Sequence, residues 1–151
     1  MQSDWNIAQI NVATALYPLD DPRIAEFVQN LDKINQMAEE TDGFVWRLKD
    51  EGTGDATSIQ VSDDPKFIVN MSVWETIPSL FEFVYKTSHV AFVGKRKTWF
   101  EMPSRPAQVL WWVPIGHIPT LDEGLAKLKT LRENGPTREA FNFKTNFPHP
   151  V

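Results

Sequence analysis

The pattern of hydrophobic and polar residues predicts β-strands in four segments of the chain, and in 6–16 and 67–74 the two kinds of residue alternate, as they do in strands whose two faces have different surroundings. The four segments are residues 6–16, 44–48, 67–74 and 107–115, and residues 58–61 suggest a further short strand. The alternation is clearest at 67–74, where Asn70, Ser72 and Trp74 share one face with Ile68 and apolar residues occupy the other. The segment 107–115 is apolar on both faces, which predicts a central strand.

Apolar residues recur every three or four positions in three further segments, which predicts amphipathic helices. These helices span residues 22–40, residues 76–100 with a bend after residue 85, and residues 120–133. The last helix begins with a capping box, in which the side chains of Thr120 and Glu123 each satisfy a backbone amide of the first turn.

The order of these elements is strand, helix, strand, strand, helix, strand. This order predicts an α+β fold of the ferredoxin-like, split βαβ type, with an antiparallel sheet and both helices on one of its faces. A length of 151 residues favours a single domain. Within it we expect a core at residues 1–115, followed by a C-terminal helix and an extended tail at residues 116–151.

The second face of this sheet would expose a large apolar surface that includes Trp111 or Trp112. Monomeric proteins seldom leave such a surface in contact with water. We therefore expect a homodimer in which the sheets of two copies face each other. In the alternative arrangement, residues 116–151 of the same chain fold back over this face.

The composition argues against several classes of protein. A net charge of −5 and a pI near 5.2 disfavour a nucleic-acid-binding surface, and the basic cluster at 94–99 spreads its cations around a helix. No apolar run approaches the roughly 18 residues of a membrane-spanning helix, and the N-terminal sequence lacks the pattern of a signal peptide. We therefore expect a cytoplasmic protein without a membrane partner. The absence of cysteine excludes disulfides and thiolate chemistry.

The stretch NMSVWETIPSLFEFVYKTSHVAFV, residues 70–93, resembles the strand-to-helix signature of dimeric α/β-barrel proteins, in particular antibiotic-biosynthesis-type monooxygenases. Over its full length the chain is similar to a bacterial family of that superfamily known only as a domain of unknown function. The shared landmarks are NMSVWE, LWWVP, GH followed by PT, and GPT. The resemblance implies a dimeric α/β barrel.

In the cofactor-independent monooxygenases of this superfamily, an Asn four residues before a Trp faces the pocket and helps to activate an aromatic substrate and dioxygen. Asn70 and Trp74 have this spacing, so the resemblance implies that Asn70 orients a substrate oxygen and that Trp74 stacks on the substrate. The family pattern also contains a Tyr and a later Arg on the following helix, and Tyr85 and Arg96 are out of clear register with them.

His89 lies four residues after Tyr85, so a continuous helix would place both on one face. Histidine has a reference pKa of ~6.5, which suits His89 to accept a proton, and Arg96 is suited to stabilise an enolate or phenolate. The catalytic candidates are therefore Asn70, His89 and Arg96. The candidates for substrate binding are Trp74, Ser72, Tyr85 and Trp112.

Three functions fit these residues. The first is a monooxygenase-like or isomerase-like enzyme that acts on a flat, hydrophobic small molecule without a cofactor. The second is a non-catalytic protein that binds a small ligand, of which haem on His89 is the most testable. The third is a dimerisation module in which Trp74 belongs to the core and Asn70 bonds a neighbouring loop. The three histidines lack the spacing of a zinc site, so we expect no metal.

Overall fold

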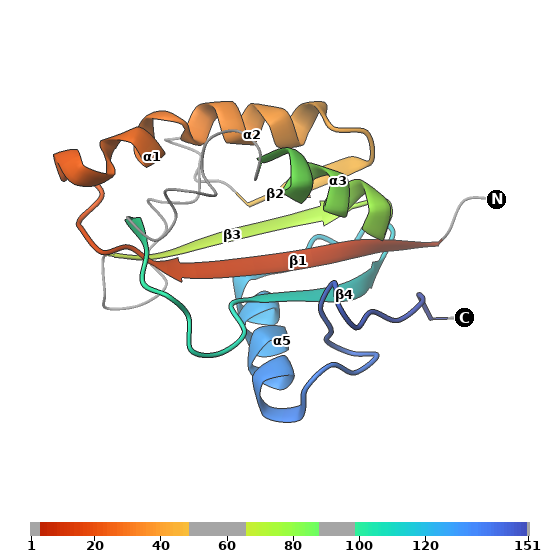
Figure 1. The fold of residues 1–151 in the computed structure, drawn as a ribbon. Coiled ribbons are helices and arrows are strands. Elements are labelled where there is room, and N and C mark those ends of the chain that lie inside the picture. Colours follow the sequence, from red (N-terminus) through yellow and green to blue (C-terminus); the bar gives the residue numbers. More distant parts are fainter. Residues whose placement is uncertain (1–3, 49–65, 88–98, 151) are drawn as a thin grey trace.

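The computed structural model describes residues 4–48, 66–87 and 99–150. A four-stranded sheet with the strand order β2-β3-β1-β4 forms its centre, and all neighbouring strands are antiparallel (Figure 1). The strands are β1 (Trp5–Thr14), β2 (Phe44–Arg47), β3 (Phe67–Trp74) and β4 (Gln108–Pro114). The four clear strands of the sequence prediction are thus confirmed, and the short strand proposed at 58–61 lies outside the described residues.

Four α-helices and one short 3₁₀-helix accompany the sheet in the described part of the chain. They are η1 (Pro22–Ile24), α1 (Ala25–Gln29), α2 (Leu31–Glu40), α3 (Ile77–Thr87) and α5 (Leu121–Asn134). The single helix predicted at 22–40 is interrupted at Asn30, whose side-chain Nδ2 donates a 2.7 Å hydrogen bond to the backbone oxygen of Glu26. Such local bonds of Asn compete with the regular helix.

The helix predicted at 76–100 is correct as far as Thr87, where the described part of α3 ends. The prediction is wrong for Phe100, which forms an isolated antiparallel bridge with Ala15 at the end of β1. The backbone amide of Glu101 continues this pairing by donating to the oxygen of Thr14 over 2.9 Å. Trp99 is still helical, and residues 100 and 101 then run beside the end of β1.

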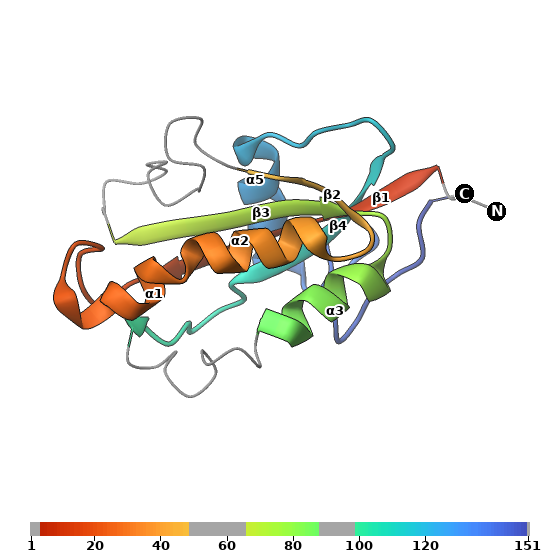
Figure 2. The same ribbon diagram turned by 90° about the horizontal axis from the view of Figure 1, so that it is seen from above.

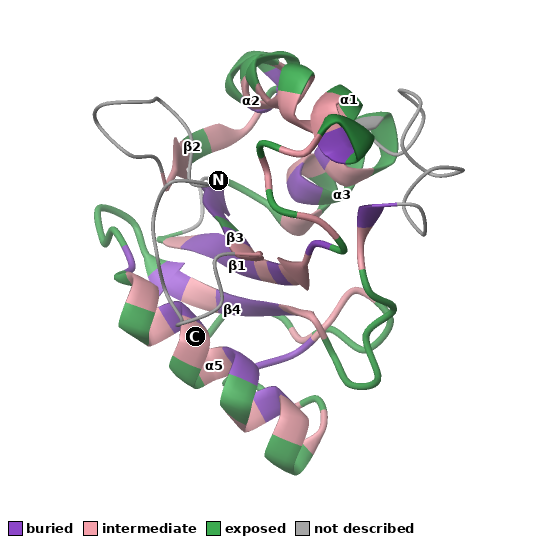
Figure 3. Cartoon of the chain, turned by 90° about the vertical axis from the view of Figure 1, so that its left-hand side faces the viewer, coloured by how far each residue is buried: buried purple, intermediate pink, exposed green. Residues whose placement is uncertain are grey.

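The helices lie on both faces of the sheet. Helices α1, α2 and α3 lie on one face, and α5 lies on the other (Figures 1 and 2). The predicted α+β fold with split βαβ order is confirmed, with both helices of the ferredoxin-like unit on one face and an additional C-terminal helix. Buried residues are concentrated on the strands and on the helix surfaces that face them (Figure 3).

Helix α5 covers the sheet face that we expected a second copy to bury. Leu128 and Leu131 of α5 pack in one cluster with Ile10, Met71 and Trp111 of the sheet, and all five are nearly inaccessible to solvent. The alternative arrangement, with residues 116–151 over this face, is therefore the one that the structure has. A dimer that joins these two sheet faces would require α5 to leave, and the homodimer itself stays a prediction.

Strand β4 is an edge strand, so the prediction of a central strand at 107–115 is wrong. Its outer edge is partly covered by the tail, because Leu110 and Phe141 exchange two backbone hydrogen bonds of 2.8 and 2.9 Å. Helix α5 covers the face of Trp111, and the tail packs on the face of Trp112. Burial on both faces explains an apolar pattern that usually indicates a central position.

Candidate functional site

A row of polar side chains crosses three strands on the sheet face that carries α1, α2 and α3. Gln108 Nε2 of β4 donates to Gln9 Oε1 of β1 over 3.1 Å. Gln9 Nε2 donates to Asn70 Oδ1 and to Ser72 Oγ of β3, each over 2.8 Å. The indole Nε1 of Trp74 also donates to Ser72 Oγ, over 2.9 Å. We call Gln108, Gln9, Asn70 and Ser72 the polar row.

The polar row is buried at its centre and exposed at Asn70. Gln9 and Ser72 are 2% and 3% exposed, and Gln9 uses its carbonyl oxygen and both amide hydrogens within the row. Asn70 is exposed, and its Nδ2 group has no hydrogen-bond partner in residues 4–48, 66–87 and 99–150. Gln9 thus holds the oxygen of the Asn70 amide, while the two N–H donors of that amide are unpaired within the described part of the chain.

Two apolar clusters flank the polar row on the same face. The residues of this face run along β1 from Ile7 through Gln9 and Asn11, and Ala15 follows directly after the strand. Ile7 belongs to a cluster with Trp74, Leu80, Phe83, Leu110 and Phe141, and Ala15 belongs to a second cluster with Ile24 and Trp99. A few polar groups between apolar walls are typical of sites that bind small organic molecules.

Trp74 lies in the core and not on an open wall. Its ring is 0% exposed, is stacked on Phe83 at 5.1 Å between centroids, and meets Phe44 edge-on at 5.5 Å. Helix α3 brings Phe83 to this position, and β2 brings Phe44. The structure therefore places Trp74 behind the polar row, where its N–H group holds Ser72 in place.

The other predicted site residues are not all brought together with the row. Tyr85 is 57% exposed on α3. Trp112 is half-buried under the tail, where its Nε1 donates to the backbone oxygen of Phe147 over 2.9 Å and its ring meets His149 edge-on. His89 and Arg96 lie outside the described residues. Of the predicted site residues, the structure therefore brings together Asn70, Ser72 and Trp74.

Gln9 and Gln108 were not among the predicted site residues. Gln9 makes three side-chain hydrogen bonds within the row and connects Gln108 to β3. The sequence signal was weak, because polar residues on one face of a strand usually contact water. The contact depends on the register of β1 against both neighbours, which an alternating pattern alone does not determine.

A second polar group lies at the first turn of α5. Thr120 Oγ1 accepts from the backbone amide of Glu123 over 3.1 Å, which is half of the predicted capping box. The Glu123 carboxylate instead accepts a 2.9 Å bond from Trp111 Nε1 and lies 2.7 Å from His117 Nε2. Trp111 is 1% exposed, so Glu123 satisfies a buried donor that has no access to water.

Glu123→Ala is expected to lower the free energy of unfolding by about 1–3 kcal/mol, because it leaves the buried Trp111 N–H without an acceptor. Asp122→Ala is the matched control, since Asp122 is also an acidic residue of the first turn but is exposed. We expect it to cost at most about 1 kcal/mol, the contribution of a negative charge at a helix N-terminus. Urea unfolding of both variants measures the difference, and equal losses would contradict the proposed role of Glu123.

Among the described residues, no group of three or more His, Asp or Glu side chains is arranged to hold a metal ion. In the same part of the chain, no helix combines the length and the apolar character that a bilayer crossing requires.

Three solved structures resemble the chain at low sequence identity. A protein of unknown function from Nitrosomonas europaea has 12% identity and a TM-score of 0.46, with 78% of this chain and 95% of that chain covered. A mutant of SnoaB, a cofactor-independent oxygenase from Streptomyces nogalater, has 12% identity and a TM-score of 0.46, with 80% and 100% covered. A candidate antibiotic biosynthesis monooxygenase from Chloroflexus aurantiacus has 16% identity and a TM-score of 0.45, with 76% and 97% covered. No curated protein sequence matches significantly.

One family model matches almost the whole chain. It covers residues 6–151, from the second residue of β1 onward, and is described as Domain of unknown function (DUF3291). The match thus includes the polar row and α5. The chain belongs to the DUF3291 family, in agreement with the full-length resemblance that its sequence landmarks predict.

Proposed function

We propose that the protein is a cofactor-independent, monooxygenase-like or isomerase-like enzyme that binds a flat, hydrophobic small molecule against the exposed end of the polar row. The observation that carries this proposal is the position of Asn70, whose amide donors have no partner among the residues that the structure describes and lie between two apolar clusters. Apolar walls provide affinity for rings, and a few fixed donors orient them.

Asn70 is proposed to donate a hydrogen bond to a substrate oxygen on which negative charge develops. A donor of this kind accelerates a reaction when it is held in place before the charge forms. The bond from Gln9 Nε2 to Asn70 Oδ1 supplies this restraint, and the bond from Gln108 to Gln9 extends it to a third strand. Trp74 and Ser72 support the row and do not need to touch the substrate.

The proposed oxidation converts a methylene group beside an aromatic ring into a carbonyl group. Dioxygen is the oxidant; one of its atoms enters the product and the other leaves as water together with the two hydrogens of the methylene. His89 is proposed to accept the first proton and Arg96 to stabilise the resulting anion, as the sequence suggests. We further propose that the enzyme is cytoplasmic and dimerises through a surface other than the one under α5.

Asn70→Ala is expected to lower kcat/KM for anthrone oxidation by roughly 100-fold or more, the usual effect of removing one donor to a developing oxyanion. The measurement is oxygen uptake with anthrone and with a quinol, together with the yield of the oxidised product. The variant also removes one of the two acceptors of the buried Gln9 amide, so thermal unfolding must establish that it is folded at the assay temperature before the rates are compared. Asn134→Ala removes an exposed asparagine at the end of α5 and is the matched control.

Equal rates for the wild type and Asn70→Ala would refute the role of Asn70. Anthrone binding without oxygen uptake would instead support a non-catalytic carrier. The haem alternative has its own test, because hemin should then produce a saturable Soret shift that is lost in His89→Ala.

A further inference from the structure

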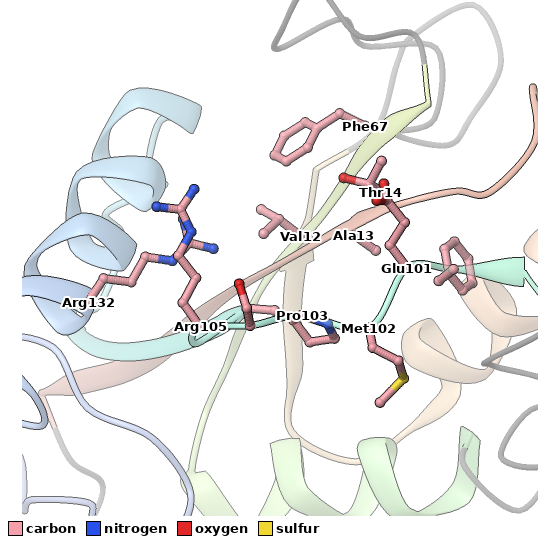
Figure 4. Close-up of a pocket in the computed structure, with 12 residues that line it drawn as sticks. Val12, Ala13, Thr14, Phe67, Glu101, Met102, Pro103, Arg105 and Arg132 are labelled. Atoms are coloured by element: carbon pink, nitrogen blue, oxygen red, sulfur yellow. The ribbon is translucent and has the colours of Figure 1, made fainter.

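A cavity of about 450 Å³ lies at the edge of the sheet, beside the C-terminal end of β1 (Figure 4). It is distinct from the polar row, none of whose members line it. Its size falls within the roughly 300–1,000 Å³ that is usual for small-molecule sites. Its apolar wall includes Val12, Phe67, Met102, Pro103 and Ala107.

The cavity results from the way in which the chain returns to the sheet before β4. The Glu101 amide donates to the Thr14 oxygen over 2.9 Å, and the Val12 amide donates to the Ala107 oxygen over 2.8 Å. Between these two anchors, residues 102–106 form an arch beside β1 instead of a paired strand. Because both ends of the arch are bonded to β1, the space beneath it is a built feature of the fold.

Two arginines reach this cavity from different elements. Arg105 belongs to the arch and Arg132 to the last turn of α5, and their side chains converge on the same side of the cavity (Figure 4). Arg132 Nε donates a 2.7 Å hydrogen bond to the backbone oxygen of Pro106, which fixes the direction of its guanidinium group. Burial and the nearby charge of Arg105 lower the pKa of Arg132.

The two guanidinium groups have no carboxylate partner in the described ranges 4–48, 66–87 and 99–150. Glu101 also lines the cavity but forms no ion pair with either arginine there, and it lies with Thr14 on the opposite wall (Figure 4). Two neighbouring positive charges repel each other, so their approach is unfavourable until an anion joins them. The two arginines thus form a locally positive site in a chain whose net charge is −5.

We propose that the cavity binds a small monoanion that combines one carboxylate with an apolar ring. The planar, forked donors of arginine match a carboxylate in geometry and charge. Arg105 and Arg132 would hold the carboxylate, and the ring would pack against Phe67 and Val12. The carboxylate of Glu101 on the far wall disfavours a second negative group, which is why a monoanion is expected.

The test measures the binding of 2-naphthoate to the full chain by isothermal titration calorimetry at low salt. The wild type should bind 2-naphthoate saturably and should bind the neutral analogue 2-naphthamide at least about tenfold more weakly, because a charge-assisted hydrogen bond is worth more than a neutral one. Arg105→Gln and Arg132→Gln should each weaken 2-naphthoate binding by about tenfold or more. Lys129→Gln removes an exposed charge three residues from Arg132, and it should change the affinity less than about twofold.

Arg105→Gln is the decisive variant, because the Arg132 side chain also bonds Pro106 and its loss can disturb the arch. Circular dichroism and thermal unfolding establish that both variants are folded. The proposal is overturned if the wild type does not bind 2-naphthoate, if 2-naphthamide binds equally well, or if folded Arg105→Gln keeps the wild-type affinity. None of these results depends on catalysis at Asn70, so the proposed function is tested separately.

Discussion

Trp74→Ala is expected to lower the free energy of unfolding by about 3–5 kcal/mol, the usual cost of truncating a fully buried large aromatic residue. The ring of Trp74 is 0% exposed and contacts Phe83 and Phe44, so its removal leaves a cavity between β3, α3 and β2. The variant also removes the indole N–H group that donates a hydrogen bond to Ser72 Oγ. Equilibrium unfolding in urea measures the loss.

Trp112→Ala provides the comparison for this result, since it removes a ring of the same size that is only half-buried under the tail. We expect a clearly smaller loss of unfolding free energy, because folding buries less apolar area of Trp112 than of Trp74. If Trp74→Ala instead costs less than about 1 kcal/mol, Trp74 is accessible in solution. The stacking role that the sequence resemblance implies for Trp74 would then be preferred to the core role.

The location of β3 could be predicted from its alternating pattern, and the observed strand Phe67–Trp74 has the predicted bounds. The period of two also placed Asn70, Ser72 and Trp74 on one face correctly. The alternating pattern did not indicate which of these three residues is buried and which is exposed. Trp74 is buried and Asn70 is exposed because α3 and β2 cover only one end of the strand, and this depends on tertiary packing.

The surroundings of β4 were harder to predict for a related reason. An apolar strand requires cover on both faces, but the pattern does not say what supplies the cover. Here α5 supplies it at Trp111 and the tail supplies it at Trp112, so a strand at the edge has the composition of a central one. The cavity beside Arg105 was not predicted either, because it depends on two backbone anchors far apart in the sequence.

Gly124→Val is expected to lower the free energy of unfolding by about 3 kcal/mol, at the upper end of the usual cost of overpacking a core. A Cβ atom at Gly124 would lie 2.9 Å from Met71 Sδ and 3.0 Å from Ile10 Cδ1, and valine adds two further methyl groups. The glycine therefore allows α5 to approach the sheet closely. Chemical denaturation of the purified variant measures the effect.

The exposed position Ala126 of the same helix supplies the control. Ala126→Val lowers the helix propensity without a clash, and it should cost no more than about 0.7 kcal/mol. If a second copy displaced α5 from the sheet in solution, Gly124 would no longer contact Met71 or Ile10. Gly124→Val would then be neutral or slightly stabilising, because valine is a better helix former than glycine. A large loss together with a dimer in sedimentation velocity would place the dimer interface elsewhere on the protein, since α5 must then stay on the sheet.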